Sequence, residues 1–309
     1  MTDRVPARPV TAVIVTYQSG RTLNQALEAA RRCYDAQLLD VVVVDNNSTD
    51  ITREIIAREA QWSRNVLSGT NNGFGRGSNL GFKEVKTPYT IFINPDAVVE
   101  PEAIRLMLQF MEHHPTIGII GPAIIEGNRD GVTKLQETGR RPTPWTVLRR
   151  AVPYLKEHSI SWPIAPGSEP APVGWVCGAV LMIRTDLLKR LGGFDPRFFL
   201  YWEEIDLCKR AEQMGFETWV LGTALAHHIG GASSLNDNNR IDGCIAKHYF
   251  QSRYYYMAKH HGRLAATVAE VGELVLLSLR SLLDVFRGRG LYRLRQRLQA
   301  PLLSQPDRE

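Results

Sequence analysis

Three acids, Glu203, Glu204 and Asp206, close a stretch at residues 192–207 that also carries several aromatic side chains. Aromatic rings stack on pyranose faces, and a carboxylate can take the proton of a sugar hydroxyl. The combination indicates a site for sugar chemistry. The alternative is an acidic helix N-terminus in which Asp206 pairs with Arg210 one turn later. That alternative explains Asp206 better than it explains the two glutamates.

A polar run at residues 45–50 follows several valines that predict a buried strand. Open α/β sheets bind ligands at the carboxyl ends of their strands, where a carboxylate can accept hydrogen bonds from a nucleobase or a ribose. In the alternative, the run is a turn in which Ser48 or Thr49 caps the next helix. Capping leaves Asp45 unexplained, so we favour ligand contact for Asp45.

One acid, Asp96, lies in an Asn94-Pro95-Asp96 sequence behind another predicted strand. Mg²⁺ and Mn²⁺ commonly bind one or two carboxylates together with substrate phosphates, so such an acid suits a divalent cation. A turn leading into the helix that begins at Pro101 is the alternative.

Two adjacent histidines, His227 and His228, precede a run of glycine and serine at 230–234. A histidine at a strand end can bind a metal or a phosphate, although a single histidine is more often structural. The glycines and serines favour phosphate contact through backbone N–H groups.

A glycine-rich run at 71–81 does not fit the dinucleotide-binding pattern, because Ser78 stands where that pattern needs its third glycine. An oxidoreductase is therefore disfavoured. The glycines permit either close approach of a ligand or tight packing of a helix.

The first half of the chain alternates β-branched runs with helical patterns, which predicts a parallel sheet covered by helices. We expect strands at 11–16, 41–44, 90–93 and 117–120, and helices at 22–32, 50–60, 75–85 and 101–113. Proline-rich residues 142–172 predict a long irregular loop. Behind it we expect strands at 175–183 and 218–221 and helices at 185–191, 203–214 and 245–261.

Composition excludes an intrinsically disordered chain, because 44% of the 309 residues are apolar and only 22% are charged. The four cysteines form no CxxC pair, so neither a disulfide framework nor a zinc knuckle is expected. No apolar segment typical of a secretion signal follows the N-terminal arginines, which favours a cytoplasmic protein.

The C-terminal tail carries the whole net charge of +5: between residues 280 and 300 there are six arginines and one acid, Asp284. An apolar stretch at 274–286 adjoins them, and this combination indicates a membrane surface rather than a nucleic-acid partner. A spanning helix needs about 20 largely uncharged residues, and Glu270, Glu273 and Arg280 interrupt the only candidate, so we expect residues 274–297 to lie on an anionic bilayer without crossing it. A helix packed on the body of the protein, with a solvated basic face, is an equal alternative.

Taken in order, these segments resemble the inverting glycosyltransferases of family two, most closely their bacterial rhamnosyltransferase-like branch. The resemblance covers residues 10–260. It is carried by the motifs at 13–17, 45–50, 71–81, 94–96, 177–179 and 192–207, and by His228-x-x-Gly231-x-Ser233.

The resemblance implies a GT-A fold, that is, a Rossmann-like α/β sheet with helices on both faces, followed by C-terminal amphipathic helices. The glycosyltransferase domain then spans residues 1–262, with a nucleotide-binding half at 10–125, the irregular loop at 140–172 and an acceptor half at 173–262. Residues 263–309 form the basic amphipathic tail.

The resemblance also implies roles for single residues. Glu204 takes the position of the catalytic base, with Glu203 and Asp206 as rivals, because Glu203-Glu204 replaces the usual Glu-Asp pair. Asp96 and His228 hold Mg²⁺ or Mn²⁺. Contacts with the nucleotide sugar are expected from Thr16, Tyr17, Asp45, Asn79, Asn94 and Asp96.

The expected function is transfer of a sugar, L-rhamnose from dTDP-rhamnose, to a lipid-linked or polysaccharide acceptor in cell-envelope glycan synthesis. One in-line displacement inverts the anomeric centre while a carboxylate deprotonates the acceptor hydroxyl. The enzyme would lie on the inner face of the plasma membrane. A non-catalytic protein that binds sugar nucleotides or polysaccharides is the alternative.

Overall fold

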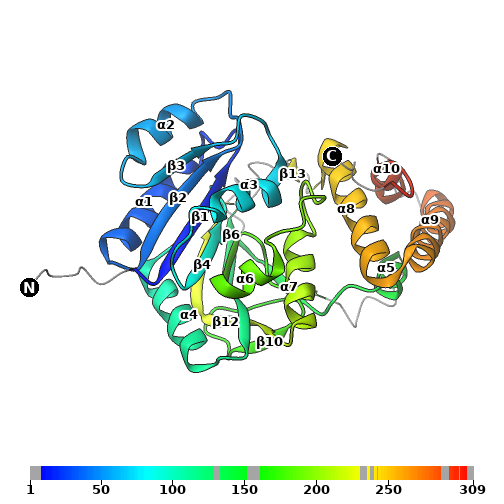
Figure 1. Cartoon of the computed structure of the whole chain (residues 1–309). Coiled ribbons are helices and arrows are strands. Elements are labelled where there is room, and N and C mark those ends of the chain that lie inside the picture. The colour runs from blue at the N-terminus through cyan, green and yellow to red at the C-terminus, as the bar shows by residue number, and fades with distance from the viewer. Residues whose placement is uncertain are drawn as a thin grey trace, which may run out of the picture. The chain divides into compact units, whose positions relative to one another are not determined.

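The chain folds into two compact units. Figure 1 shows the computed structural model, which describes residues 8–127, 133–151, 161–229, 235–236, 240–241, 243–286, 292–298 and 300–304. The sheet unit comprises Met1–Gly139, Trp162–Pro196 and Glu204–Ser233. The helical unit comprises Arg140–Ser161, Arg197–Glu203 and Ser234–Glu309.

A mixed β-sheet forms the centre of the sheet unit, with its strands in the order β10-β12-β6-β11-β4-β1-β2-β3. β5 and β7 pair with β12 and β6, β8 pairs with β9, and β13 pairs with β14. The bounds are β1 Val10–Thr16, β2 Leu39–Asp45, β3 Arg64–Leu67, β4 Tyr89–Ile93, β5 Ala97–Val99, β6 Ile117–Gly127, β7 Thr133–Leu135, β8 Glu137–Gly139, β9 Ser161–Pro163, β10 Ala171–Val173, β11 Val180–Arg184, β12 Glu217–His228, β13 Leu235–Asn236 and β14 Arg240–Ile241.

The strands predicted at 11–16, 41–44, 90–93 and 117–120 are confirmed, each within β1, β2, β4 or β6. The parallel arrangement predicted for the first half of the chain is confirmed for these strands. β1, β2, β3 and β4 are parallel, and β6 runs in the same direction because β11 lies antiparallel between β4 and β6. The direction of β11, from the second half of the chain, cannot be predicted from the sequence pattern, because a run of buried apolar residues looks the same in either orientation.

Helices cover both faces of the sheet, as expected. Alternate residues of β1 face opposite sides: Ala12 and Ile14 pack with α1, α2 and α4, whereas Val13 and Val15 pack with α3, α6 and α7. The bounds are α1 Leu23–Asp35, α2 Thr52–Glu59, α3 Gly73–Phe82, α4 Pro101–His113, α6 Thr185–Leu191 and α7 Glu203–Gln213.

Two predicted elements need correction. The proline-rich stretch at 142–172 is not uniformly irregular, since it contains α5 (Pro144–Ala151), β9 and β10. The strand predicted at 218–221 continues to His228, so both histidines lie inside β12 rather than behind it. Its last residues stay in the strand because β5 and β6 pair with them.

The glycine-rich run forms α3, where its glycines serve close packing on the sheet. A Cβ atom at Gly81 would come within 2.5 Å of Val13 and 2.8 Å of Val44. The packing interpretation of this run is therefore correct for Gly81.

We expect Gly81→Ala to lower the free energy of unfolding by about 1–3 kcal/mol, because the new methyl group overpacks β1 and β2. Urea unfolding measures the change. Gly127→Ala is the matched control, since nothing lies within 4 Å of a Cβ there. Equal stability of the two variants would show that α3 can move away from the sheet at no cost.

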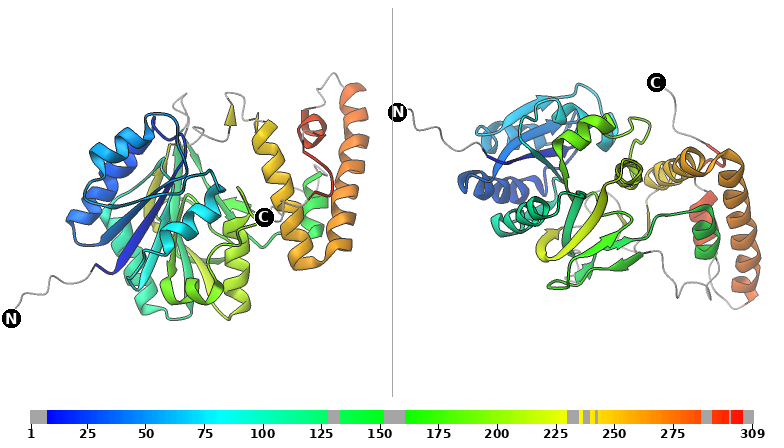
Figure 2. Two further views of the ribbon diagram at one scale, coloured as in Figure 1. Left: turned by 45° about the horizontal axis from the view of Figure 1, so that its top comes forward. Right: turned by 60° about the horizontal axis from the view of Figure 1, so that its bottom comes forward.

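The helical unit contains α5, α8 (Gly243–His261), α9 (Arg263–Phe286) and α10 (Tyr292–Leu298), which Figure 2 shows as one cluster. The sequence predicted a domain boundary between residues 262 and 263, whereas the compact unit seen here groups α8 with α9 and α10, on which it packs. Among the described residues, no helix combines the length and apolarity that crossing a bilayer requires.

Buried ion pairs join three helices of this unit. Arg253 of α8 donates to Glu273 (2.9 Å) and Glu270 (3.2 Å) of α9. Arg297 of α10 also pairs with Glu270, and both guanidinium groups lie over the ring of Phe250. Burial, and then the charge of Arg253, lower the pKa of Arg297 to about 10. Arg297, expected on the basic surface, is therefore part of the interior.

We expect Arg253→Met to lower the free energy of unfolding by about 3 kcal/mol or more, because it leaves two buried carboxylates with the single charge of Arg297 between them. Thermal unfolding followed by circular dichroism measures the change. Arg295→Met, at an exposed position on α10, is the control and should change stability by less than about 0.5 kcal/mol.

Candidate active site

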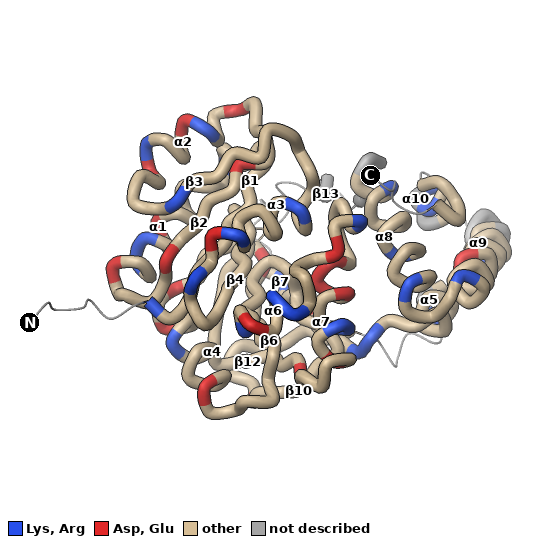
Figure 3. Tube along the Cα trace, in the orientation of Figure 1, with Lys and Arg blue, Asp and Glu red and all other residues tan. Residues whose placement is uncertain are grey.

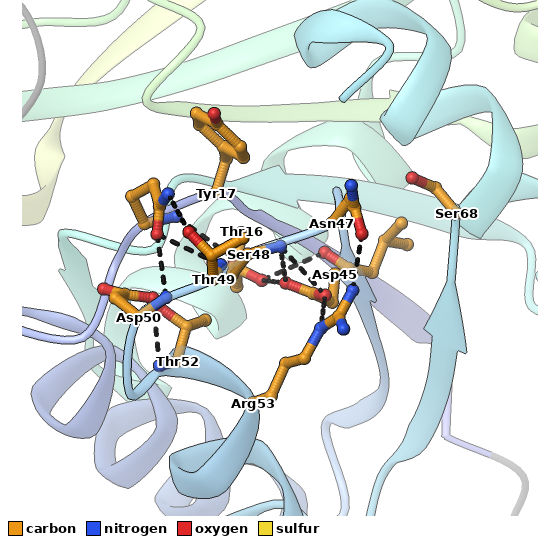
Figure 4. A network of polar contacts seen from close by, with 12 residues as sticks. Thr16, Tyr17, Asp45, Asn47, Ser48, Thr49, Asp50, Thr52, Arg53 and Ser68 are labelled. Carbon is orange, nitrogen blue, oxygen red and sulfur yellow. Dashed lines mark hydrogen bonds and ion pairs between the residues drawn. The ribbon is translucent and has the colours of Figure 1, made fainter. Parts of the chain in front are cut away.

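The carboxyl ends of β1 and β2 hold a polar network around Asp45 (Figure 4). The carboxylate accepts hydrogen bonds from the Ser48 backbone N–H at 3.2 Å and from Arg53 Nε at 2.7 Å. The Thr16 hydroxyl lies 3.4 Å from Asp45 Oδ1. Asp45 is only 1% exposed, so Arg53, whose side chain is half exposed, covers it from solvent.

Asp45 thus has a structural purpose that the sequence did not reveal, because it fixes the loop behind β2. The capping alternative is wrong for Ser48 and Thr49. Ser48 Oγ accepts from the Gln18 N–H, and the Thr49 hydroxyl accepts from the Gln18 side-chain amide. Instead, Asp50 Oδ1 accepts from the Thr52 N–H at the start of α2.

Two residues of this network adopt the left-handed backbone conformation, Gln18 with φ 51° and Asn47 with φ 68°. Such strain persists only where the surroundings enforce it, and it concentrates at functional sites. Tyr17, beside Gln18, is 46% exposed. The network therefore presents one aromatic ring and the Arg53 guanidinium to a ligand, above a buried carboxylate.

The second group of polar side chains surrounds Asp96. The strand pairing sets His228 opposite Ala97 of β5 and opposite Glu126 of β6. His228 Nε2 lies 3.0 Å from Asp96 Oδ1, and its Nδ1 lies 4.0 Å from Glu126. Burial lowers the pKa of His228, but the hydrogen bond and charge of Asp96, with the charge of Glu126, outweigh it and raise the pKa overall.

The Asp96–His228 pair is chemically suited to a divalent cation. One carboxylate oxygen and one imidazole nitrogen already lie in contact, and substrate phosphates and water commonly complete such a site. Within the described ranges, no three His, Cys, Asp or Glu side chains gather as a metal site. His227 is exposed, because neighbours in a strand point to opposite faces. Gly231 and Ser233 lie outside the described residues.

The segment Cys177-Gly178-Ala179 links Glu204 to this group. A Cβ atom on Gly178 would lie 3.6 Å from the Glu204 side chain, and Ala179 O accepts from the Asn94 N–H at 2.9 Å. Burial, and then the charges of Glu204, Glu126 and Asp96, raise the pKa of the Cys177 thiol to about 12. The segment therefore contacts Glu204 at Gly178 and the backbone of Asn94, two residues before Asp96, at Ala179.

The other acids of α7 differ from Glu204 in their surroundings. Figure 3 shows acidic residues grouped along α7. Asp206 is fully buried and accepts from Arg210 Nε at 2.7 Å, and Arg210 also donates to the carbonyls of Leu191 and Gly193. This is the predicted pairing one turn apart. Glu203 is 5% exposed.

Much of the aromatic set at 192–207 packs internally and forms no open sugar platform. Phe194 contacts Phe92 at 4.9 Å between ring centroids within the sheet unit. Within the helical unit, Trp202 contacts Tyr256 and Phe198 contacts Tyr255. Composition alone could not separate rings of the core from rings of a binding site.

Asn79 holds a neighbouring turn. Its Nδ2 donates to Phe194 O, and its Oδ1 accepts from the Phe194 N–H, both at 2.8 Å. The sequence resemblance predicted contact with the nucleotide sugar for Asn79. Because both ends of its amide are engaged by Phe194, we assign Asn79 to positioning this turn instead.

We expect Asn79→Ala to lower the free energy of unfolding by about 1–3 kcal/mol, because it leaves buried backbone groups unpaired. Nucleotide affinity should change less than threefold, or about 0.6 kcal/mol. Calorimetric titration with dTDP and Mn²⁺ measures the affinity. A large loss of dTDP affinity without a loss of stability would show that Asn79 contacts the donor.

Sequence reasoning missed Arg53, Gln18 and Glu126. Arg53 follows Asp45 by eight residues and lies on a helix, where a basic residue is unremarkable. Glu126 reaches the site only through the pairing of β6 with β12. A weak signal did exist for Glu126, because an acid at the end of an apolar strand is unusual.

Solved structures share this architecture. Over 94% of this chain, it is similar to the mannosyltransferase PcManGT from Pyrobaculum calidifontis in complex with GDP-Man and Mn²⁺, with 84% of that chain covered, a TM-score of 0.54 and 16% identity. S. aureus TarS 1–349 in complex with UDP gives a TM-score of 0.50 at 16% identity, over 94% of this chain and 90% of that one. The fold is therefore that of the GT-A glycosyltransferases.

The sequence comparison identifies the family. The model of glycosyl transferase family 2 matches residues 11–171, and the chain belongs to this family, on its rhamnosyltransferase-like side. N-acetylglucosaminyl-diphospho-decaprenol L-rhamnosyltransferase of Mycobacterium tuberculosis strain H37Rv is 26% identical over 287 residues, which cover 84% of this chain and 86% of the relative. Rhamnosyltransferase WbbL of Escherichia coli K12 is 22% identical over 73% of this chain and 84% of its own length.

Proposed function

We propose that this protein is an inverting, metal-dependent glycosyltransferase that moves L-rhamnose from dTDP-rhamnose to a lipid-linked or polysaccharide acceptor of the cell envelope. The observation that carries the proposal is that His228 contacts Asp96, while the segment 177–179 contacts both the Glu204 side chain and the backbone of Asn94, two residues before Asp96. The printed names of the two rhamnosyltransferase relatives support the sugar, and the decaprenol in one of them supports the lipid-linked acceptor.

The donor would be held by both polar groups. The register of β1 with β2 and β4 brings Thr16, Asp45 and the start of Asn94-Pro95-Asp96 to one edge of the sheet. Tyr17 would stack on the nucleobase. Asp45 meets the base only when Arg53 gives up its ion pair, so donor binding includes movement of that guanidinium.

Mg²⁺ or Mn²⁺ held by Asp96 and His228 would neutralise the negative charge that develops on the leaving diphosphate. Glu204 accepts the proton of the acceptor hydroxyl, whose oxygen attacks the anomeric carbon opposite the leaving group. A single displacement inverts that carbon. Glu203 and Asp206 remain rivals for the base, although the ion pair with Arg210 already engages the Asp206 carboxylate.

A lipid-linked acceptor would bring the enzyme to the inner face of the membrane. The basic apolar tail at 274–297 supports this location. A binding protein without turnover is the second candidate, favoured by one observation: Glu203-Glu204 stands where the family has Glu-Asp.

We expect Glu204→Gln to lower the turnover of dTDP-rhamnose about a hundredfold or more while Mn²⁺-dependent dTDP binding stays intact, because the amide cannot accept the proton. Asp96→Asn should lose both turnover and metal-dependent binding. Release of dTDP, with a membrane lipid extract as acceptor, measures turnover, and calorimetric titration measures binding.

Glu212→Gln on α7, whose acid pairs with Lys209, is the matched control and should behave as the wild type. Full turnover in the presence of EDTA would contradict the metal assignment. If Glu204→Gln keeps full turnover and Glu203→Gln loses turnover, Glu203 is the base. Tight dTDP binding without transfer to any extract would favour the binding protein.

A further inference from the structure

One face of α9 is apolar and exposed over most of the helix. The exposed fractions lie between 48% and 79% for Leu264, Val268, Val271, Val275 and Leu279. These residues follow one another at spacings of three or four, which keeps them on one side of a helix. We call them the outer stripe.

The acids of α9 whose side chains the structure describes lie on the opposite side from the outer stripe. Glu270 and Glu273 are buried and paired with Arg253 and Arg297. A surface helix usually keeps its charges in water, but α9 buries both glutamates beside Ala266, Ala269 and Leu277 and exposes the outer stripe. Because the buried ion pairs hold the helix in this rotation, the outer stripe cannot turn inward without uncovering two paired carboxylates.

Cations lie at the ends of this region. Arg263 begins α9 at an exposed position, and Arg295 of α10 is exposed as well. The sequence adds Arg287, Arg289 and Arg293, whose side chains lie outside the described part. The side of α9 that carries the outer stripe shows no acid among the described residues, so the surroundings suit an apolar partner that is rimmed by negative charge.

We propose that the outer stripe of α9 is a docking surface for an anionic lipid bilayer. The helix lies flat, its aliphatic side chains enter the boundary between headgroups and acyl chains, and the neighbouring arginines contact anionic headgroups. This inference deepens the proposed membrane location and rests on it. It also moves the contact from residues 274–297 to 264–279 and removes Arg297 from the basic surface.

A second copy of this chain is the competing occupant, because spacings of three and four also occur in helix pairs. The charge distribution favours the bilayer. Two copies would bring their arginine-rich segments together, whereas an anionic leaflet attracts both the arginines and the stripe.

The test is flotation of the full chain with vesicles of phosphatidylcholine alone or mixed equally with phosphatidylglycerol. Wild-type protein should float mainly with the anionic vesicles. Val271→Glu should lower the bound fraction about tenfold, because a charge in the stripe opposes insertion. Val271→Ser should give an intermediate loss. Met214→Glu, an exposed apolar position of the sheet unit, is the matched control and should bind as the wild type.

Thermal unfolding and dTDP binding, measured on the same samples, should be equal in all variants. Failure of dTDP binding would contradict the proposed function and leave the vesicle result standing. Equal flotation of wild type and Val271→Glu would overturn the docking surface, as would equal losses in Val271→Glu and Met214→Glu. A dimer that Val271→Glu dissociates, without vesicle binding, would assign the stripe to a second copy.

Discussion

The candidate site depends on one strand register. β12 pairs with β5 on one side and β6 on the other, and this double pairing brings His228, Asp96 and Glu126 together from three distant parts of the sequence. A slip of one residue would turn His228 to the opposite face and bring His227 inward. The N–H of Ile229, the residue after His228, donates to the backbone oxygen of Asp96 at 2.8 Å. This hydrogen bond fixes the end of β12 beside Asp96.

The two polar groups of the site are built by opposite means. Around Asp45, a short loop with two left-handed residues folds its side chains back on the backbone, and the carboxylate is satisfied locally. Around Asp96, the partners come from separate strands. Local loops adapt to a ligand at low cost, whereas strand-held groups stay in place. Arg53, on a half-exposed side chain over Asp45, therefore belongs to the adaptable group, and Asp96 belongs to the strand-held group.

Sequence patterns predicted the ends of strands well and the partners of side chains poorly. The sequence singled out Asp45 and Asp96 as candidates because acids at or just beyond the ends of valine- or isoleucine-rich strands are conspicuous. Arg53 and Glu126 were missed, because their roles depend on a helix orientation and on the neighbour of β6, which no local pattern encodes. The fold class was predictable because strand patterns alternate with helix patterns along the sequence. The antiparallel insertion of β11 and the burial of Arg297 were not predictable. Both depend on contacts between residues far apart in the chain.

The helical unit is assembled from three separate stretches of the chain, of which Arg197–Glu203 directly precedes the rest of α7. Such a unit cannot be removed by truncating the C-terminus, because two of its stretches lie inside the chain. Cutting the chain after Gly262 would strip α8 of α9 and leave Arg253 without its carboxylates, while α5 would lose the helix it packs on. The C-terminal helices therefore share one interior with α5 and α8, so changes that preserve this interior are confined to their exposed positions.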